Sequence, residues 1–349
     1  MNAYQEILRA HGARILITGD SLSYNRYSYD PEARGEACQC GAGMGSWSFA
    51  LRDRLIAADD SFRYGEEIEF DCESTLGLDN NSDVPFTAML QGRIRTLYPK
   101  GAVHFCLEGN GERIVLYFQR RLDSACQFDV YVDGELAARD VCTEGDPSRF
   151  AGYEWMSVTL PCDAKKKSHA LCFLVKRGEK LTVVGAGSSC REVILNGVGG
   201  KATEFFLEHF EERIGAYSPD VALLCLGAND RIRIAPAVLR RSLVELFSKI
   251  YECNRECRIL LITPPTSHLI DSPEEDRMPY VALDTCRVYD RAEELAVEDV
   301  RKQGFFADVL FSREVFDGID VPIWRADDIH MTQEGNRLLL QAVCERLGI

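Results

Sequence analysis

The sequence lacks a long apolar run and is short of basic residues. No stretch reaches the roughly 18 apolar residues that a membrane-spanning helix needs, and its beginning lacks the apolar core and cleavage site of a secretory signal peptide. Lys and Arg number 40 against 55 Asp and Glu, a net charge of −15, so a nucleic-acid backbone or an anionic membrane would be repelled overall. We therefore expect a cytoplasmic protein with neither nucleic acid nor a membrane as a partner. The acidic balance also favours a neutral or cationic substrate over a polyanion.

Several chemical motifs are absent too. The chain has no GxSxG nucleophile elbow, no P-loop and no GxGxxG after a strand, which disfavours an α/β-hydrolase fold and a nucleotide site. Its 14 cysteines include no CxxC pair, and buried thiols in a reducing compartment account for them best. Cys38 with Cys40, and Cys253 with Cys257, have no nearby histidine or second pair that would complete a tetrahedral site. We predict no metal site.

What is present is enough material for two domains. The 349 residues are 46% hydrophobic and 27% charged, and one hydrophobic core rarely grows beyond about 250–300 residues. Apolar runs that predict strands alternate with segments of helical periodicity, and this alternation predicts a parallel sheet covered by helices on both faces. The predicted strands are 14–18, 192–196, 220–226 and 258–263, and the predicted helices are 46–58, 203–217, 236–252, 279–303 and 332–347.

A different sequence pattern interrupts this alternation of strands and helices from about residue 66 to residue 181. Apolar and polar residues alternate there with period two, in short runs separated by Gly, Asp, Asn and Pro. The turn VDGE at 132–135 is a hairpin signal. We predict an antiparallel β-sandwich or jelly roll at 63–184, inserted into an α/β domain that comprises 1–62 and 185–349.

Polar or glycine-rich loop segments follow three of the predicted parallel strands. Ser21 follows the first strand, Gly199 and Gly200 follow the second, and Asn229 follows the third. In an open α/β sheet, ligands bind beyond the carboxyl ends of the strands, so these residues should line one edge. Each motif alone is more often an ordinary turn or helix cap, and their fixed order along one edge favours a functional site.

The residue types fit acyl transfer. The serine hydroxyl at 21 needs an imidazole to take its proton, and the imidazole needs a carboxylate to hold its tautomer. Asp327 and His330, three residues apart in a late loop, could supply both, although a lone DxxH is more often a surface ion pair. The amides of Ser21 and Gly200 and the side-chain amide of Asn229 could bind an oxyanion.

Four segments together resemble a known family. They are GDSL at 19–22, NGVGGKAT at 196–203, GAND at 227–230 and DDIH at 327–330. The set resembles the four sequence blocks of the SGNH hydrolases, also called GDSL esterases and lipases, over about residues 10–60 and 185–349.

The resemblance implies roles for individual residues. Ser21 is expected to be the nucleophile and His330 the general base, with Asp327 orienting the imidazole. The backbone amide of Ser21, Gly200 and Asn229 are expected to form the oxyanion hole. The resemblance also implies a flavodoxin-like three-layer fold and no metal or organic cofactor.

Two of these residues have a neighbour in the sequence that could take the same role. Gly199 is an alternative to Gly200, and Asp328 adjoins Asp327, which has the better spacing to the histidine. We expect Asp20, Gly199, His268 and Trp324 to line the substrate pocket, and Trp47 to pack in the core.

The sequence therefore predicts a serine esterase that removes a short acyl group, first of all O-acetyl, from a carbohydrate, with an O-acylated small molecule or glycan as its substrate. The inserted sandwich is similar in architecture to carbohydrate-binding-like domains attached to some bacterial acetylesterases, including peptidoglycan O-acetyl esterases. An O-acyltransferase that uses the same site and a non-catalytic glycan-binding protein are the alternatives. Acyl length, glycan and oligomeric state stay open.

Overall fold

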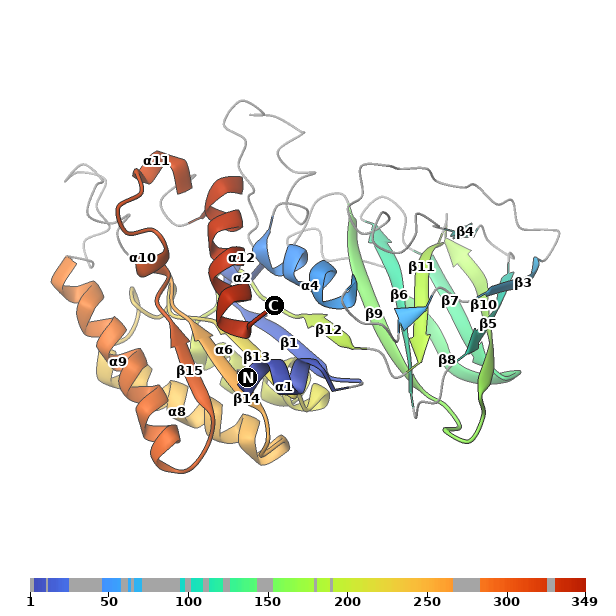
Figure 1. Cartoon of the computed structure of the whole chain (residues 1–349), viewed down its shortest axis with the longest axis horizontal. Coiled ribbons are helices and arrows are strands. Elements are labelled where there is room, and N and C mark those ends of the chain that lie inside the picture. The colour runs from blue at the N-terminus through green and yellow to red at the C-terminus, as the bar shows by residue number, and fades with distance from the viewer. Residues whose placement is uncertain are drawn as a thin grey trace. The chain divides into compact units, whose positions relative to one another are not determined.

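The chain is described here from a computed structural model (Figure 1). The structure describes residues 3–10, 12–24, 46–57, 62–63, 66–70, 95–97, 102–108, 113–121, 126–142, 153–178, 181–188, 191–265, 283–324 and 330–349. The chain forms two compact units, residues 1–51 with 194–349, and residues 52–193. None of the helices in the described ranges combines the length and the apolar character of a membrane span.

A five-stranded parallel sheet forms the centre of the first unit (Figure 1). Its inner strands are buried along nearly their whole length, because helices cover both faces and the apolar runs need not alternate. The flavodoxin-like α/β fold is thereby confirmed. In spatial order the strands are β12 (Glu192–Leu195), β1 (Arg14–Gly19), β13 (Val221–Cys225), β14 (Arg258–Ile262) and β15 (Ala307–Leu310).

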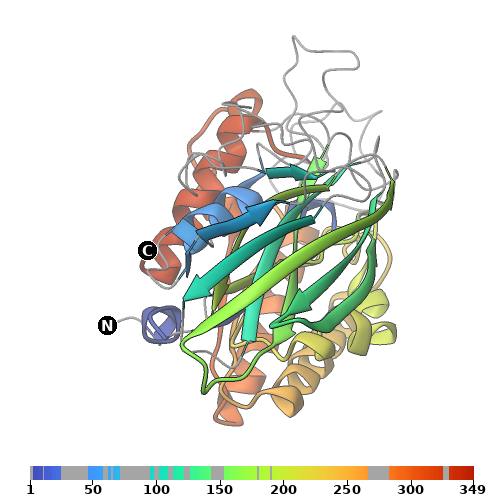
Figure 2. The same ribbon diagram turned by 90° about the vertical axis from the view of Figure 1, so that its right-hand side faces the viewer.

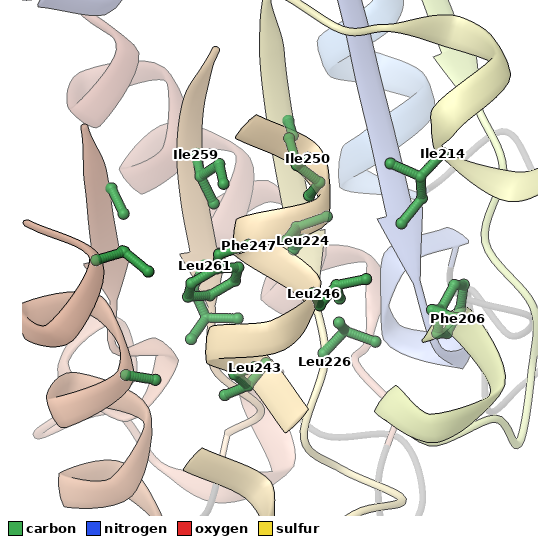
Figure 3. Packing of buried hydrophobic residues seen from close by; sticks show 14 of the residues in the cluster. Phe206, Ile214, Leu224, Leu226, Leu243, Leu246, Phe247, Ile250, Ile259 and Leu261 are labelled. Carbon is green, nitrogen blue, oxygen red and sulfur yellow. The ribbon is translucent and has the colours of Figure 1, made fainter. Parts of the chain in front are cut away.

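The longer helices agree with the predicted periodicity. Helix α8 (Pro236–Cys253) packs Leu243, Phe247 and Ile250 against the sheet, where they meet Leu224 and Leu261 (Figure 3). The described residues contain five more helices of at least six residues: α1 (Ala3–Leu8), α4 (Trp47–Ala57), α6 (Thr203–Glu208), α9 (Leu283–Lys302) and α12 (Gln333–Leu347). The remaining pieces are single turns: α2 (Ser21–Tyr24), α7 (Phe210–Arg213), η1 (Gly215–Tyr217), α10 (Ser312–Val315) and α11 (Val321–Trp324).

Three local predictions differ from the structure. The predicted helix 203–217 is broken into α6, α7 and η1, because His209 and Ile214 leave helical geometry. Strand β15 and helix α1 were not predicted, since they have only 4 and 6 residues and show no clear period. Helix α1 is fixed by tertiary contacts instead, among them a 2.9 Å hydrogen bond from the Tyr4 hydroxyl to the carbonyl oxygen of Ile259.

Two antiparallel sheets make up the second unit (Figure 2). One contains β3 (Glu66–Phe70), β5 (Ala102–Glu108), β10 (Ser168–Gly178), β7 (Cys126–Val132) and β8 (Glu135–Cys142). The other contains β2 (Phe62–Arg63), β11 (Leu181–Ser188), β6 (Arg113–Arg121) and β9 (Tyr153–Pro161), with β4 (Arg95–Leu97) paired to β11.

The two sheets share one apolar core. The rings of Phe118 on β6 and Phe128 on β7 meet edge to face with centroids 5.1 Å apart, and Leu116 and Phe173 belong to the same buried cluster. The predicted antiparallel sandwich is therefore confirmed. The exact boundaries after residues 62 and 184, and the carbohydrate-binding-like character of the insert, stay predictions.

The hairpin predicted at VDGE joins β7 to β8. Asp133 and Gly134 both have positive φ, at 55° and 84°, which is the requirement of a type I′ turn. The Asp133 carboxylate then accepts hydrogen bonds from the Ala170 amide at 3.0 Å and from Lys166 at 2.9 Å. The turn is thus fastened to the neighbouring part of the sandwich.

We expect Gly19→Ala to destabilise the first unit severely. A Cβ at Gly19 would lie 1.9 Å from the carbonyl oxygen of Cys225, and the φ of Gly19 is +141°. Neither backbone can move without breaking the β1–β13 ladder, so the loss in unfolding free energy should exceed about 3 kcal/mol. Urea unfolding followed by circular dichroism measures it.

Gly304→Ala is the matched control. Gly304 also has positive φ, at 87°, but nothing lies within 4 Å of the added carbon. This substitution should cost only about 1–2 kcal/mol, the strain of a left-handed residue. Equal losses for the two variants would contradict the role of the close approach to Cys225.

Candidate active site

Three predicted site segments begin side by side at the carboxyl edge of the sheet. Gly19, the last residue of β1, pairs in register with Cys225, the last residue of β13. On its other side the Gly19 carbonyl accepts a 2.8 Å hydrogen bond from the amide of Val198, just after β12. The loops that carry Ser21, Gly200 and Asn229 therefore start from three adjacent strands.

Ser21 is the first residue of the single-turn helix α2 and is half-buried. The turn before it is held by Asp20, which is fully buried. The Asp20 carboxylate accepts a 2.9 Å hydrogen bond from the Leu22 amide, and its carbonyl accepts hydrogen bonds from the amide and hydroxyl of Ser23 at 3.0 and 2.7 Å. The indole of Trp47, buried as predicted, donates to the carbonyl of Leu22 at 2.8 Å. Ser21 thus stands on a fixed turn.

His330 acts on the same turn through its charge. The pKa of Asp20 is raised from 3.8 to about 7, mainly by burial and in part by the carboxylate of Asp230. The amides of Leu22 and Ala228 and the charge of His330 oppose this rise in pKa. His330 is half-buried and directly precedes the segment that starts α12. Asp20 of the first predicted segment is therefore influenced by the charges of Asp230 in the third segment and His330 in the fourth.

The third segment also holds the second one in place. The Asn229 side-chain nitrogen donates to the carbonyl of Lys201 at 3.2 Å, and the Arg233 guanidinium donates to the carbonyl of Gly200 at 3.1 Å. Asp230 accepts the amide of Thr203, the first residue of α6, at 3.0 and 3.2 Å. An amide nitrogen carries two hydrogens, so Asn229 keeps one for a ligand.

Gly200 has φ +72°, a conformation that suits glycine, and an added Cβ would meet nothing within 4 Å. Its backbone is therefore open to a ligand on that side. Gly199 precedes it in the same turn and is less exposed. The structure thus favours neither glycine by sterics alone, and the assignment of Gly200 to the oxyanion hole stays a prediction.

Sequence reasoning missed a buried ion network beneath the third segment. The Arg231 guanidinium lies 2.7 Å from both Asp290 and Glu293 of α9, and all three side chains are buried. Burial raises the pKa of Glu293 to about 7, against the opposing charge of Arg231. A Cβ on Gly227 would lie 2.5 Å from Glu293, so the loop rests directly on this network. Arg231 follows GAND in the sequence, but its partners lie about 60 positions later.

Not every predicted site residue can be placed. Asp327 and its neighbour Asp328, and also His268, lie outside the described residues. Trp324 is the last residue of α11, and its side chain lies outside the described part. The roles of the predicted catalytic, oxyanion and pocket residues stay predictions.

One cleft of about 840 Å³ lies between α8 and α9, lined by residues such as Arg240, Val244 and Val288. None of the predicted site residues lines it. Within the described ranges, no three His, Cys, Asp or Glu side chains gather as a metal site would require. Cys253 and Cys257 are free thiols there, and Cys38 and Cys40 lie outside the described residues.

Comparison with solved structures gives matches along much of the chain. A peptidoglycan O-acetylesterase is 16% identical, with 99% of this chain and 95% of that chain covered and a TM-score of 0.47. A family two carbohydrate esterase from Clostridium thermocellum is 12% identical, with 72% and 99% covered and a TM-score of 0.35. An acetylxylan esterase from Geobacillus stearothermophilus is 19% identical, with 46% and 74% covered and a TM-score of 0.35. No curated protein matches the chain.

The sequence itself matches a family model. Residues 181–338 match the GDSL-like Lipase/Acylhydrolase family, a range that includes the second, third and fourth predicted segments. The chain therefore carries a GDSL-like lipase/acylhydrolase domain, and it is a hydrolase that acts on ester bonds. The resemblance drawn from the four sequence segments is confirmed.

We expect Arg231→Met to lower the unfolding free energy by about 3–5 kcal/mol, because it leaves Glu293 buried without a cation and Asp290 paired only with Arg313. Arg337→Met is the control. Arg337 pairs with Glu334 at 2.6 Å on an exposed helix surface, and such pairs contribute about 1 kcal/mol or less. Urea unfolding compares the two variants, and similar losses would contradict the importance of the buried network.

We expect Asp20→Asn to flatten the pH dependence of stability. In the folded chain the pKa of Asp20 is raised from 3.8 to about 7. At pH values between these two pKa values, unfolding therefore releases a proton from Asp20. The unfolding free energy consequently falls as pH rises from about 4 to 7. Asparagine does not titrate, so the difference in unfolding free energy between pH 5 and pH 8 should shrink by roughly 1 kcal/mol or more. The control Glu334→Gln, at an exposed carboxyl whose pKa is lowered, should leave the difference nearly unchanged.

Proposed function

We propose that the chain is a serine esterase that removes an O-acetyl group from a carbohydrate. Ser21 Oγ attacks the ester carbonyl while His330 accepts its proton, and Asp327 orients the imidazole. The amides of Ser21 and Gly200 and the Asn229 side chain donate to the oxyanion. When the intermediate collapses, the sugar alcohol leaves with the proton from His330, and water then hydrolyses the acyl-serine by the same steps.

One observation carries this proposal. The loops of Gly200 and Asn229 are hydrogen-bonded to each other through Lys201, at 3.2 Å, and both begin beside the strand that Ser21 follows. A nucleophile and preorganised donors at neighbouring strand ends are what acyl transfer requires. The turn that carries Ser21 is fixed by the hydrogen bonds of Asp20, so little reorganisation is needed there.

The assignment of the general base has separate support. The charge of His330 acts on Asp20, the residue before the proposed nucleophile. A histidine at that place can reach the serine turn, and a neutral imidazole nitrogen can accept the proton of a serine hydroxyl. The role of Asp327 rests on its spacing to His330 in the sequence.

For the substrate we propose an O-acetylated carbohydrate. The inserted antiparallel sandwich supports this class, since a separate β domain in the same chain as the hydrolase domain suits a polymeric or oligomeric glycan better than a small free ester. The solved structures named above are described as esterases of such substrates. An acetyl group is short, so its binding needs no apolar groove.

We expect Ser21→Ala and His330→Ala each to lower kcat for p-nitrophenyl acetate by roughly a thousandfold or more, because the nucleophile and its base act as a unit. Asn229→Ala should lower kcat by about 10²–10³-fold, the usual loss for one oxyanion donor. Release of p-nitrophenol measures all three, and circular dichroism shows whether each variant is folded.

Ser248→Ala and His209→Ala are the matched controls. Ser248 bonds to the carbonyl of Val244 within α8, and His209 is exposed after α6. Both controls should keep wild-type turnover. Full activity in Ser21→Ala would rule out the mechanism. Acetyl transfer to an added glycan instead of water would identify an acyltransferase, and glycan binding without any turnover would identify a binding protein.

A further inference from the structure

Two exposed cations flank the proposed oxyanion glycine. Lys201 follows Gly200 directly, and Arg233 donates from its guanidinium to the carbonyl of Gly200 at 3.1 Å. Throughout the ranges that the structure describes, neither side chain forms an ion pair. Burial raises the pKa of Asp230, and the charge of Arg233 is among the causes that oppose this rise. Both carboxylate oxygens of Asp230 accept the Thr203 amide.

The lysine is held in place by an aromatic ring. Its ammonium lies 4.9 Å from the centroid of the Phe205 ring, a cation–π arrangement. The half-buried Phe205 ring also packs against the His209 ring, with centroids 4.5 Å apart. The ammonium of Lys201 therefore lies over a residue in the first turn of α6 and is not paired with an acidic side chain in the described part.

These two charges contrast with the chain as a whole, which carries a net charge of −15. Glu204 on the same turn of α6 is exposed, yet it forms no ion pair with Lys201 among the described residues. Elsewhere in this unit, exposed arginines such as Arg291 and Arg337 are paired with acids of their own helix. Lys201 and Arg233 therefore place two positive charges next to Gly200 in the sequence and in its hydrogen bonding, where a negative group of a ligand can pair with them.

We propose that Lys201 and Arg233 form a subsite for a carboxylate on the alcohol part of the ester, so that the enzyme prefers O-acetylated acidic sugars. This inference rests on the proposed function, because it uses Gly200 as the position of the reacting carbonyl. The carboxylate binds the two cations in the ground state and in the transition state alike. The subsite should therefore act mainly on KM and little on kcat.

Two acetyl esters that differ in charge test the subsite. The probes are 4-acetoxybenzoate, which is anionic, and 4-acetoxybenzamide, which is neutral, with acetate release as the readout. The measured quantity is the ratio of kcat/KM for the anionic ester to that for the neutral ester. Lys201→Gln and Arg233→Gln should each lower this ratio about two- to fivefold, the range for exposed charge pairs, through KM of the anionic ester. High salt should lower the wild-type ratio in the same sense.

Two matched variants control for charge alone. Lys249 also lies over a phenylalanine ring, 5.1 Å from the centroid of Phe210, and Arg255 is exposed beyond the end of α8. Both stand near the carboxyl end of α8, which leads to the start of β14 and so to the opposite edge of the sheet. Lys249→Gln and Arg255→Gln should leave the ratio at its wild-type value.

The possible results separate the two proposals. If Lys201→Gln and Arg233→Gln leave the ratio unchanged, or if the control variants lower it equally, the subsite is refuted while the esterase assignment stands. If the wild type releases no acetate from either ester, the esterase proposal fails and the subsite falls with it. A ratio that drops only in the two site variants supports both.

Discussion

The close approach of Gly19 to the carbonyl of Cys225 is the constraint on which the rest of the site depends. It keeps β1 and β13 in register to their last residues, and the next amide, that of Asp20, then donates to the same carbonyl at 3.0 Å. The chain can turn only after this point, so the serine turn starts level with the third segment. Any side chain at Gly19 would separate the two strand ends. One backbone contact thus sets the distance between the proposed nucleophile and the loop of Asn229.

Buried charge collects directly behind this edge. Asp20, Asp230 and Glu293 are all buried and have raised pKa values, and Arg231 is buried with them. Such groups cost desolvation energy that apolar residues would not, and strongly perturbed carboxyls cluster at functional sites. Two successive residues of one loop bind two different helices: Asp230 accepts the amide at the start of α6, and Arg231 pairs with acids of α9. The loop that carries Asn229 is therefore anchored to both helices.

The sequence predicted the features that depend on local pattern. Continuous apolar runs predicted the inner strands, and Asp133-Gly134 predicted the hairpin, because both signals lie within a few residues. The strand β15 and the break at His209 escaped prediction, since tertiary contacts outweigh propensity in such short pieces. The network of Arg231 could not be predicted, because its partners on α9 are distant in sequence and only the packing of α9 against the loop brings them together. The role assigned to Asp327 still rests only on its spacing of three residues from His330 in the sequence.

Net charge is a poor guide to the substrate because the nearest charges dominate a site. At physiological ionic strength the Debye length is about 8 Å, so acids on distant helices contribute little to the field beside Gly200. Arg231 adds little there as well, since two buried carboxylates neutralise it at 2.7 Å. Arg233, two residues further along, is exposed and keeps its charge. Burial and pairing therefore decide which basic residues a substrate meets, and the total of −15 does not exclude an anionic one.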